Sequence, residues 1–91
     1  MTDMRGYVYI LKSLVNERYY IGSTTNINSR FDKHQRGLVK STKNLRPLKI
    51  ELVQEYESIT IAKQIEYRIK QLKRRDYLEK MIKSGHIKMS V

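Results

Sequence analysis

Five side chains in this sequence are of the types that phosphodiester hydrolysis requires. They are two tyrosines, an arginine, a histidine and a glutamate: Tyr9, Tyr20, Arg30, His34 and Glu66. An arginine fork stabilises charge on phosphate oxygens, and an imidazole exchanges protons near neutral pH. One carboxylate, completed by phosphate and water, is a usual way of holding Mg²⁺. A free phenol titrates near ~10, so a tyrosine acting as a base needs a cation that lowers its pKa.

Two strand-like segments contain the tyrosines. Residues 7–11 and 19–21 are rich in aromatic, β-branched and other apolar side chains, a composition typical of strands. Turn-forming residues lie at both ends of the segment between them. This pattern predicts a β-hairpin.

The register of this hairpin decides which side chains meet. A turn centred on residues 14 and 15 would pair Tyr9 with Tyr20 and Tyr7 with Gly22. Directly opposite residues of an antiparallel pair have their side chains on the same face, so the phenols of Tyr9 and Tyr20 would stand side by side. The glycine would leave open space on that face.

A helix over residues 27–36 is predicted next, capped by the preceding Thr-Thr-Asn and ended by a glycine. Four residues at positions i, i+3, i+4 and i+7 share one face of this helix: Ile27, Arg30, Phe31 and His34. The stacking of Arg30 and His34 on one edge favours a functional role. The alternative is that both groups flank an apolar stripe and extend to water.

Residues 48–56 alternate apolar and polar side chains and are predicted to be a third strand. A helix over residues 59–73 follows, capped by Ser58, with Glu66 at the border of its apolar stripe. Taken alone, this glutamate is better explained by an ordinary surface ion pair with Lys70, one turn later. A metal-ligand role needs further support.

The C-terminal part is predicted to contain a shorter helix over residues 76–82, with Asp76 as its cap and Gly85 as its stop. Residues 86–91 are expected to form a loose tail. The resulting order, β-β-α-β-α-α, predicts an α/β (α+β) domain with a small three-stranded antiparallel sheet flanked by helices. A chain of 91 residues is expected to be one domain, with a core from about 6 to 83.

The charge of the chain points to a polyanionic partner. Nineteen Lys and Arg residues against nine Asp and Glu give a formal net charge of +10. The basic loop over residues 38–46 carries Lys40, Lys43 and Arg46 among hydroxyl and amide side chains that also bind phosphate. DNA is the default partner and RNA is not excluded, whereas an anionic membrane surface or a merely solvated basic shell are the alternatives.

Cysteine usage and hydropathy bear on the compartment. The chain contains no cysteine, so it has neither disulfides nor a thiolate metal site. No secretory signal is visible at the N-terminus, and no apolar stretch approaches the ~20 residues that span a bilayer. We therefore expect a cytoplasmic protein without membrane attachment.

Two short motifs and their spacing resemble a known family. Tyr7-Val8-Tyr9 and Tyr20-Ile21-Gly22 are similar to the paired motif of the GIY-YIG nuclease superfamily, although Tyr7 stands where the family has glycine. The match continues with Arg30 eight residues after the motif glycine, His34 four residues further on, and Glu66 on a later helix. The match covers about residues 7–72. The chain resembles the small stand-alone bacterial members of the family, which are similar to the catalytic domains of excinucleases and homing endonucleases.

The resemblance implies a role for each site residue. Tyr9 would be the general base, with Tyr20 orienting water or phosphate and His34 helping to take the proton of Tyr9. Arg30 would stabilise the scissile phosphate, and Glu66 would bind Mg²⁺ or Mn²⁺. Two other positions depart from the family pattern, because Ser23 and Met81 stand where many or some members have lysine and asparagine.

The leading hypothesis is thus a Mg-dependent endonuclease acting on DNA, selective for DNA structure rather than sequence, in DNA repair or processing. Specificity would come from DNA shape or from a protein partner, and the molecule would be a monomer or a weak dimer. The alternative is a basic nucleic-acid-binding module of the same fold in which catalysis is slow or lost.

Overall fold

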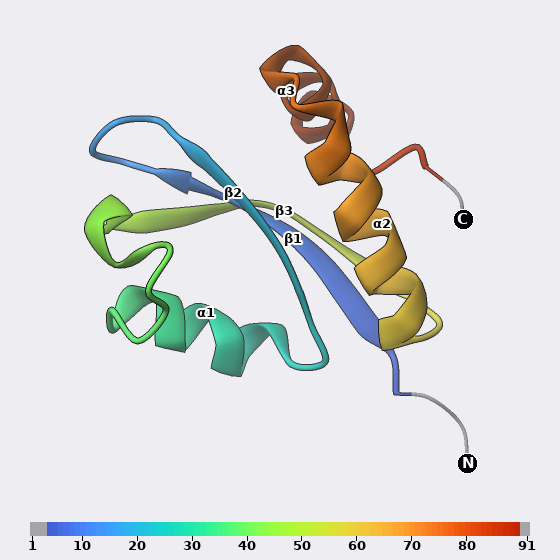
Figure 1. The fold of residues 1–91 in the computed structure, drawn as a ribbon, viewed down its shortest axis with the longest axis horizontal. Helices are drawn as coiled ribbons and strands as arrows, with labels where there is room; N and C mark the ends of the chain where they lie inside the picture. Colours follow the sequence, from blue (N-terminus) through green and yellow to red (C-terminus); the bar gives the residue numbers. More distant parts are fainter. Residues whose placement is uncertain (1–3, 90–91) are drawn as a thin grey trace.

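Three strands form one antiparallel sheet in the order β2-β1-β3 in the computed structural model, which describes residues 4–89. The strands are β1 (Gly6–Ser13), β2 (Tyr19–Thr24) and β3 (Leu48–Tyr56). With three helices, the element order is β-β-α-β-α-α, so the predicted fold class is confirmed. Helix α1 (Ile27–Gln35) lies on one side of the sheet and α2 (Ile59–Leu72) on the other (Figure 1).

The central strand β1 divides the core into two layers. Val8 and Ile10 point toward α2 and belong to the larger apolar cluster, whereas Tyr9 and Leu11 point toward α1 and belong to the smaller one. All four side chains are almost completely buried. This alternation follows from the period of two along a strand, and it places the tyrosine of the first motif on the α1 side.

The hairpin register differs from the predicted one by two residues. Tyr9 pairs with Gly22, and Tyr20 pairs with Leu11, so the expected Tyr9–Tyr20 pair is wrong. The expected partner of Tyr7 is also wrong, because Tyr7 pairs with Thr24. A shift of two residues keeps each side chain on the same face, and the two phenols therefore remain diagonal neighbours.

The turn explains this shift. The Ser13 backbone N–H donates to the Arg18 carbonyl at 2.8 Å, so the loop consists of the four residues between them. The Ser13 hydroxyl accepts from the N–H groups of Val15 and Asn16 at 3.2 and 3.3 Å. Glu17 then adopts a left-handed backbone with φ 63° at the end of this four-residue loop. The predicted two-residue turn would have needed positive φ at Leu14 or Val15, where apolar and β-branched side chains disfavour it.

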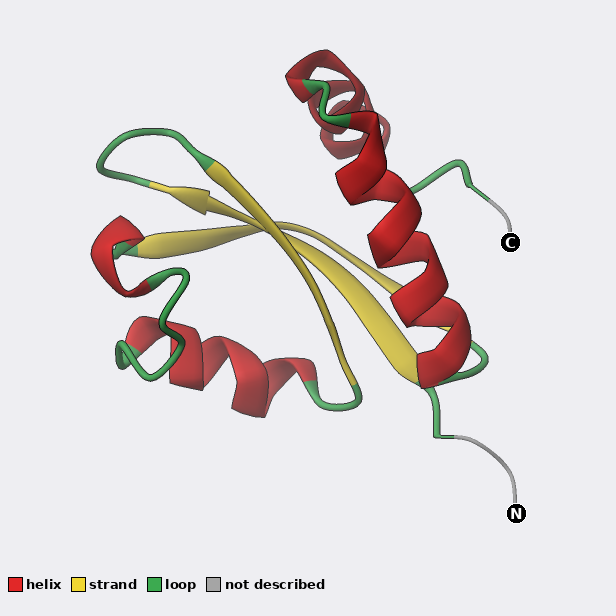
Figure 2. Ribbon diagram, in the orientation of Figure 1, coloured by secondary structure: helices red, strands yellow, loops and turns green. Residues whose placement is uncertain are grey.

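Caps define the helix ends much as the sequence predicted. The Asn26 side chain accepts from the Ser29 N–H at the start of α1, and Ser58 accepts from the Ile61 N–H at the start of α2. Gly37 follows α1 with φ 76°, a conformation that suits a helix end. A short 3₁₀ helix, η1 (Lys43–Leu45), precedes β3 within the basic loop (Figure 2).

The last helix, α3 (Arg75–Ser84), begins one residue earlier than predicted. Its N-cap is Arg74, and the expected capping role of Asp76 is wrong. The Asp76 carboxylate instead accepts two bonds from the Arg74 guanidinium, at 2.8 and 3.1 Å. Gly85, with φ 83°, ends the helix as expected.

The segment after α3 is held in the core rather than loose. Ile87 is only 3% exposed, and its N–H and carbonyl bond to the side-chain amide of Gln54 at 2.6 and 3.2 Å. The prediction of a loose tail is therefore corrected for residues 86–89, and residues 90 and 91 lie outside the described part. Within residues 4–89, no helix is long and apolar enough to cross a bilayer.

Candidate active site

The hydroxyl of Tyr9 is the point where the predicted site residues meet. Tyr9 is 1% exposed, and its oxygen lies 2.9 Å from His34 Nε2 and 3.3 Å from Arg30 Nε. The ring fills the space above Gly22, where a Cβ atom would lie 2.5 Å from Tyr9 Cζ. The glycine of the second motif is thus required by the tyrosine of the first.

His34 is buried and bonded at both ring nitrogens. Its Nδ1 lies 2.7 Å from Thr42 Oγ, and the Thr42 hydroxyl donates its single proton to the Val39 carbonyl at 3.4 Å. With the Thr42 hydroxyl donating to Val39, Thr42 accepts from Nδ1–H and Nε2 accepts from the Tyr9 hydroxyl; we assign this tautomer from the hydrogen-bond network. Burial, followed by the charge of Arg30, lowers the pKa of His34 to about 4, so the ring is neutral at pH 7.

Tyr20 completes an aromatic cluster with these two rings. Its centroid lies 5.1 Å from that of His34, with an edge-on arrangement of the rings, and 6.3 Å from that of Tyr9, with tilted planes. The ring comes from β2, the edge strand, and remains partly exposed. Tyr20 is therefore the ring of this cluster that reaches solvent, since Tyr9 and His34 are buried.

The pKa of Tyr9 is raised above its usual value. Burial is the main cause, and the charges of Tyr20 and Glu66 act in the same direction, whereas the bond and charge of Arg30 act against it. Arg30 thus lowers the phenol pKa as expected, but the cost of burying a phenolate is larger. The pKa of Arg30 is in turn raised by its bond to Tyr9. The resting site holds a protonated tyrosine beside a permanent cation.

Glu66 approaches the site from α2, past the edge of the sheet. One carboxylate oxygen accepts from the hydroxyl of Ser23 on β2, and the other lies 2.6 Å from Lys70 Nζ. The Lys70 ammonium lies 5.8 Å from the Tyr20 ring centroid. Four of the five predicted residues thus contact one another directly, and Glu66 adjoins them through Lys70.

Comparison with known proteins shows the family of this chain. The family model of the GIY-YIG catalytic domain matches residues 5–81, most of the chain. The chain belongs to the GIY-YIG family. The resemblance seen in the sequence is therefore confirmed, and because the GIY-YIG domain is a nuclease domain, it supports endonuclease activity in general.

This chain aligns over most of its length with relatives of similar size. It is 36% identical over 78 residues to a UPF0213 protein of Oceanobacillus iheyensis, covering 85% of this chain and 90% of that one. A UPF0213 protein of Clostridium perfringens is 37% identical over 83 residues, covering 90% and 87% of the two chains. No solved structure matches the chain at a significant level.

The donor set of this GIY-YIG site suits a hard cation bound by few protein ligands. Within residues 4–89, no three His, Cys, Asp or Glu side chains come together as a metal site. Glu66 alone supplies a carboxylate, with 19% of its side chain exposed, and the Ser23 hydroxyl oxygen adjoins it. One carboxylate completed by phosphate and water fits Mg²⁺ or Mn²⁺. Such a cation would replace the Lys70 ammonium.

The predicted phosphate-binding loop is divided between two roles. Lys40 and Lys43 are exposed, and Lys43 lines a shallow cavity of about 510 Å³ together with Gln35, Arg46 and Pro47. The Arg46 guanidinium donates to the carbonyls of Lys43 at 2.9 Å and Gln35 at 3.4 Å. Arg46 therefore stabilises the loop itself, whereas neither of the two lysines forms an ion pair within residues 4–89.

Three residues near the site escaped the sequence reasoning as functional groups. Thr42 lies in an irregular loop where no periodicity marks it, and the sequence marks Ser23 only as a departure from the family pattern. The sequence marks Lys70 only as the i+4 partner of Glu66. The available signal was the pair of side chains that flank Glu66. They are Lys70, one helical turn later, and the hydroxyl of Ser23, directly after the second motif.

Proposed function

We propose that this protein is a metal-dependent endonuclease that hydrolyses phosphodiester bonds in DNA, in repair or processing. The observation that carries the proposal is the Tyr9 hydroxyl, which bonds to a cation, Arg30, and to a buried neutral base, His34. This arrangement in a nuclease-family domain supplies both a proton acceptor and charge stabilisation at one point.

Proton transfer from Tyr9 to His34 explains how a tyrosine with a raised pKa can act as a base. As Tyr9 accepts a proton from the attacking water, it passes its own proton to His34 Nε2, so a free phenolate never forms. Thr42 keeps His34 in the tautomer that can accept this proton. The developing imidazolium lies near the incoming phosphate, whose negative charge favours it.

Arg30 has a second task in this proposal. A guanidinium carries five N–H donors, and its bond to Tyr9 uses Nε, so other donors of the fork can meet phosphate oxygens. This contact would place the scissile phosphate close to the Tyr9 hydroxyl and stabilise its charge in the transition state.

Glu66 would hold the metal ion. A bound Mg²⁺ or Mn²⁺ would neutralise charge on the phosphate and on the leaving oxygen. For this the carboxylate must give up the ammonium of Lys70, which then lies free to contact a neighbouring phosphate. The pairing also keeps an unliganded carboxylate from repelling the substrate.

DNA is proposed as the substrate because of the basic surface and the family. The formal charge is +10, and Lys40 and Lys43 extend from the loop beside α1. Phosphate contacts carry no sequence information, so selectivity would depend on DNA structure or on a partner protein. Affinity should therefore fall steeply as salt rises.

The second candidate function is a binding module with little or no catalysis. It is favoured by one observation, that both oxygens of Glu66 are already engaged, by Ser23 and Lys70. A binder would use the same basic surface without needing the metal.

A cleavage assay separates the two functions. Purified protein is incubated with duplex, flap and branched DNA and with RNA, in Mg²⁺, Mn²⁺ or EDTA, beside Glu66→Gln. We expect metal-dependent cleavage by the natural protein, none by the variant, and equal or tighter binding by the variant because a negative charge is lost. If the natural protein cuts nothing in any metal, the binding module takes its place. If Glu66→Gln cuts equally fast, the metal-ligand role is wrong.

A further inference from the structure

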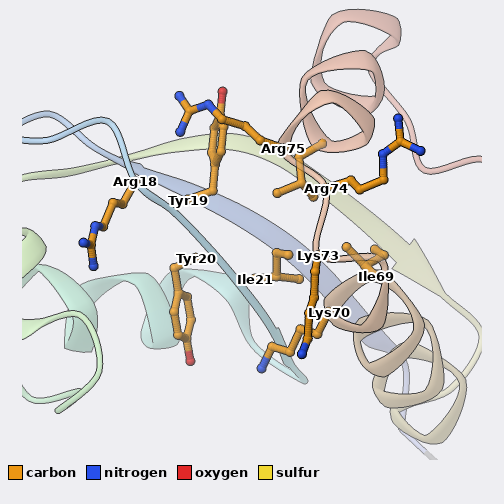
Figure 3. A pocket seen from close by; sticks show the side chains of 10 residues that line it. Arg18, Tyr19, Tyr20, Ile21, Ile69, Lys70, Lys73, Arg74 and Arg75 are labelled. Carbon is orange, nitrogen blue, oxygen red and sulfur yellow. The ribbon is translucent and has the colours of Figure 1, made fainter.

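A second basic surface adjoins the active site at Tyr20. It is a cavity of about 410 Å³ between the edge strand β2, the end of α2 and the start of α3 (Figure 3). Its cationic lining consists of Arg18, Lys70, Lys73, Arg74 and Arg75. None of the side chains that line it is acidic, and the site described above uses only one of these cations.

The rest of the lining is apolar and aromatic. Ile21, Ile69 and Leu78 form the aliphatic part, and Tyr19 and Tyr20 the aromatic part. Figure 3 shows the two tyrosines pointing to opposite sides of β2. The cavity thus follows the open edge of the sheet, with Tyr20 at one end.

Contacts between the hairpin and α3 hold the walls in place. The Arg75 guanidinium stacks 4.5 Å from the Tyr19 ring centroid and donates to the Glu17 carbonyl at 2.9 Å. Lys73 ends α2 in a left-handed conformation with φ 50°, which turns the chain into α3. These contacts fix the start of α3 against the hairpin, and with it the two sides of the cavity.

The cations differ in how far their charge is already balanced. Arg74 pairs with Asp76 at 2.8 Å, Arg75 lies 3.5 Å from Glu79, and Lys70 is paired with the active-site carboxylate. Arg18 and Lys73 are exposed, and no ion pair is formed by either within residues 4–89. These two side chains are the ones with charge to offer a ligand.

We propose that this cavity binds an unpaired nucleotide and its flanking phosphates, next to the scissile bond. The apolar and aromatic side chains of the lining suit a base and sugar, and its cationic side chains suit phosphates. A base that is stacked inside a duplex cannot enter such a concavity. The proposal rests on the proposed function and narrows its substrate to nucleic acid with a single-stranded segment beside the cut.

The test measures binding without cleavage. The double variant Arg18→Gln/Lys73→Asn removes both free charges, and asparagine tolerates the left-handed backbone at position 73. The matched control Lys83→Gln/Lys88→Gln loses the same charge from exposed positions outside the cavity. Fluorescence anisotropy in EDTA gives the affinity of each protein for a blunt duplex and for a duplex with a five-nucleotide flap, over a series of salt concentrations.

We expect the natural protein and the control to prefer the flapped DNA by about tenfold, the order of effect that one held base produces. The cavity variant should lose this preference, and its salt slope on flapped DNA should fall by about 1.4, since each single-strand phosphate contact contributes about 0.7.

Three outcomes would overturn the proposal. These are an unchanged flap preference in the cavity variant, an equal loss of affinity for both DNAs, and an equal loss of preference in the control. The second would assign the cavity to duplex phosphates. Cleavage in Mg²⁺ is recorded separately, and a natural protein that cuts nothing yet keeps its flap preference would refute the proposed function alone.

Discussion

The buried His34 should make the stability of the protein depend on pH between 5 and 7. Its pKa is about 4 in the folded protein and 6.5 in a model peptide, so the unfolded chain binds the proton more readily. The stabilisation is complete above pH 6.5 and is lost as the pH falls toward 4. Linkage gives a loss of about 2 kcal/mol from pH 7 to 5 and about 3 kcal/mol by pH 4.

Urea denaturation followed by circular dichroism at pH 7, 6 and 5 measures this loss at constant ionic strength. His34→Gln should remove the slope, because the amide does not titrate, whereas His86→Gln should keep it, because His86 is exposed. The range stops at pH 5 since most carboxylates titrate below it. If His34→Gln retained the full loss of about 2 kcal/mol, the argument for a buried neutral imidazole would be refuted.

Three substitutions test other parts of the site. Gly22→Ala should lower the free energy of unfolding by about 1–3 kcal/mol, because the added methyl group meets the Tyr9 ring, and an unchanged urea midpoint would contradict that contact. Thr42→Val should cost about 1–3 kcal/mol and change the tautomer of His34 in ¹⁵N NMR spectra, whereas identical spectra would show that Thr42 does not orient the ring. Lys70→Gln should tighten Mg²⁺ binding in isothermal titration, because the ammonium no longer competes for Glu66, and weaker binding would refute competition.

Most of the fold could be predicted because its periodicities are local. Alternation placed β3 at residues 48–56, and the side-chain caps at Asn26 and Ser58 lie at expected helix starts. The register of the β1–β2 hairpin could not be predicted, since it depends on the backbone conformation of the turn at Glu17 rather than on any pattern of side chains.

The site was partly predictable for the same reason. The i, i+4 spacing brought Arg30 and His34 to one edge of α1, where both reach the Tyr9 hydroxyl. Thr42 could not be predicted, because an irregular loop brings it to His34. The raised pKa of Tyr9 was also beyond the sequence, since it depends on how deeply the phenol is buried.

The most direct test of the account is single-turnover cleavage by Tyr9→Phe. The substitution removes one oxygen, which both Arg30 and His34 contact, and leaves the ring over Gly22. We predict that the rate falls by about 10²-fold or more, as expected for loss of a general base, while DNA affinity in EDTA stays within about twofold. A variant that cleaves at the rate of the natural protein would contradict the central role of this hydroxyl.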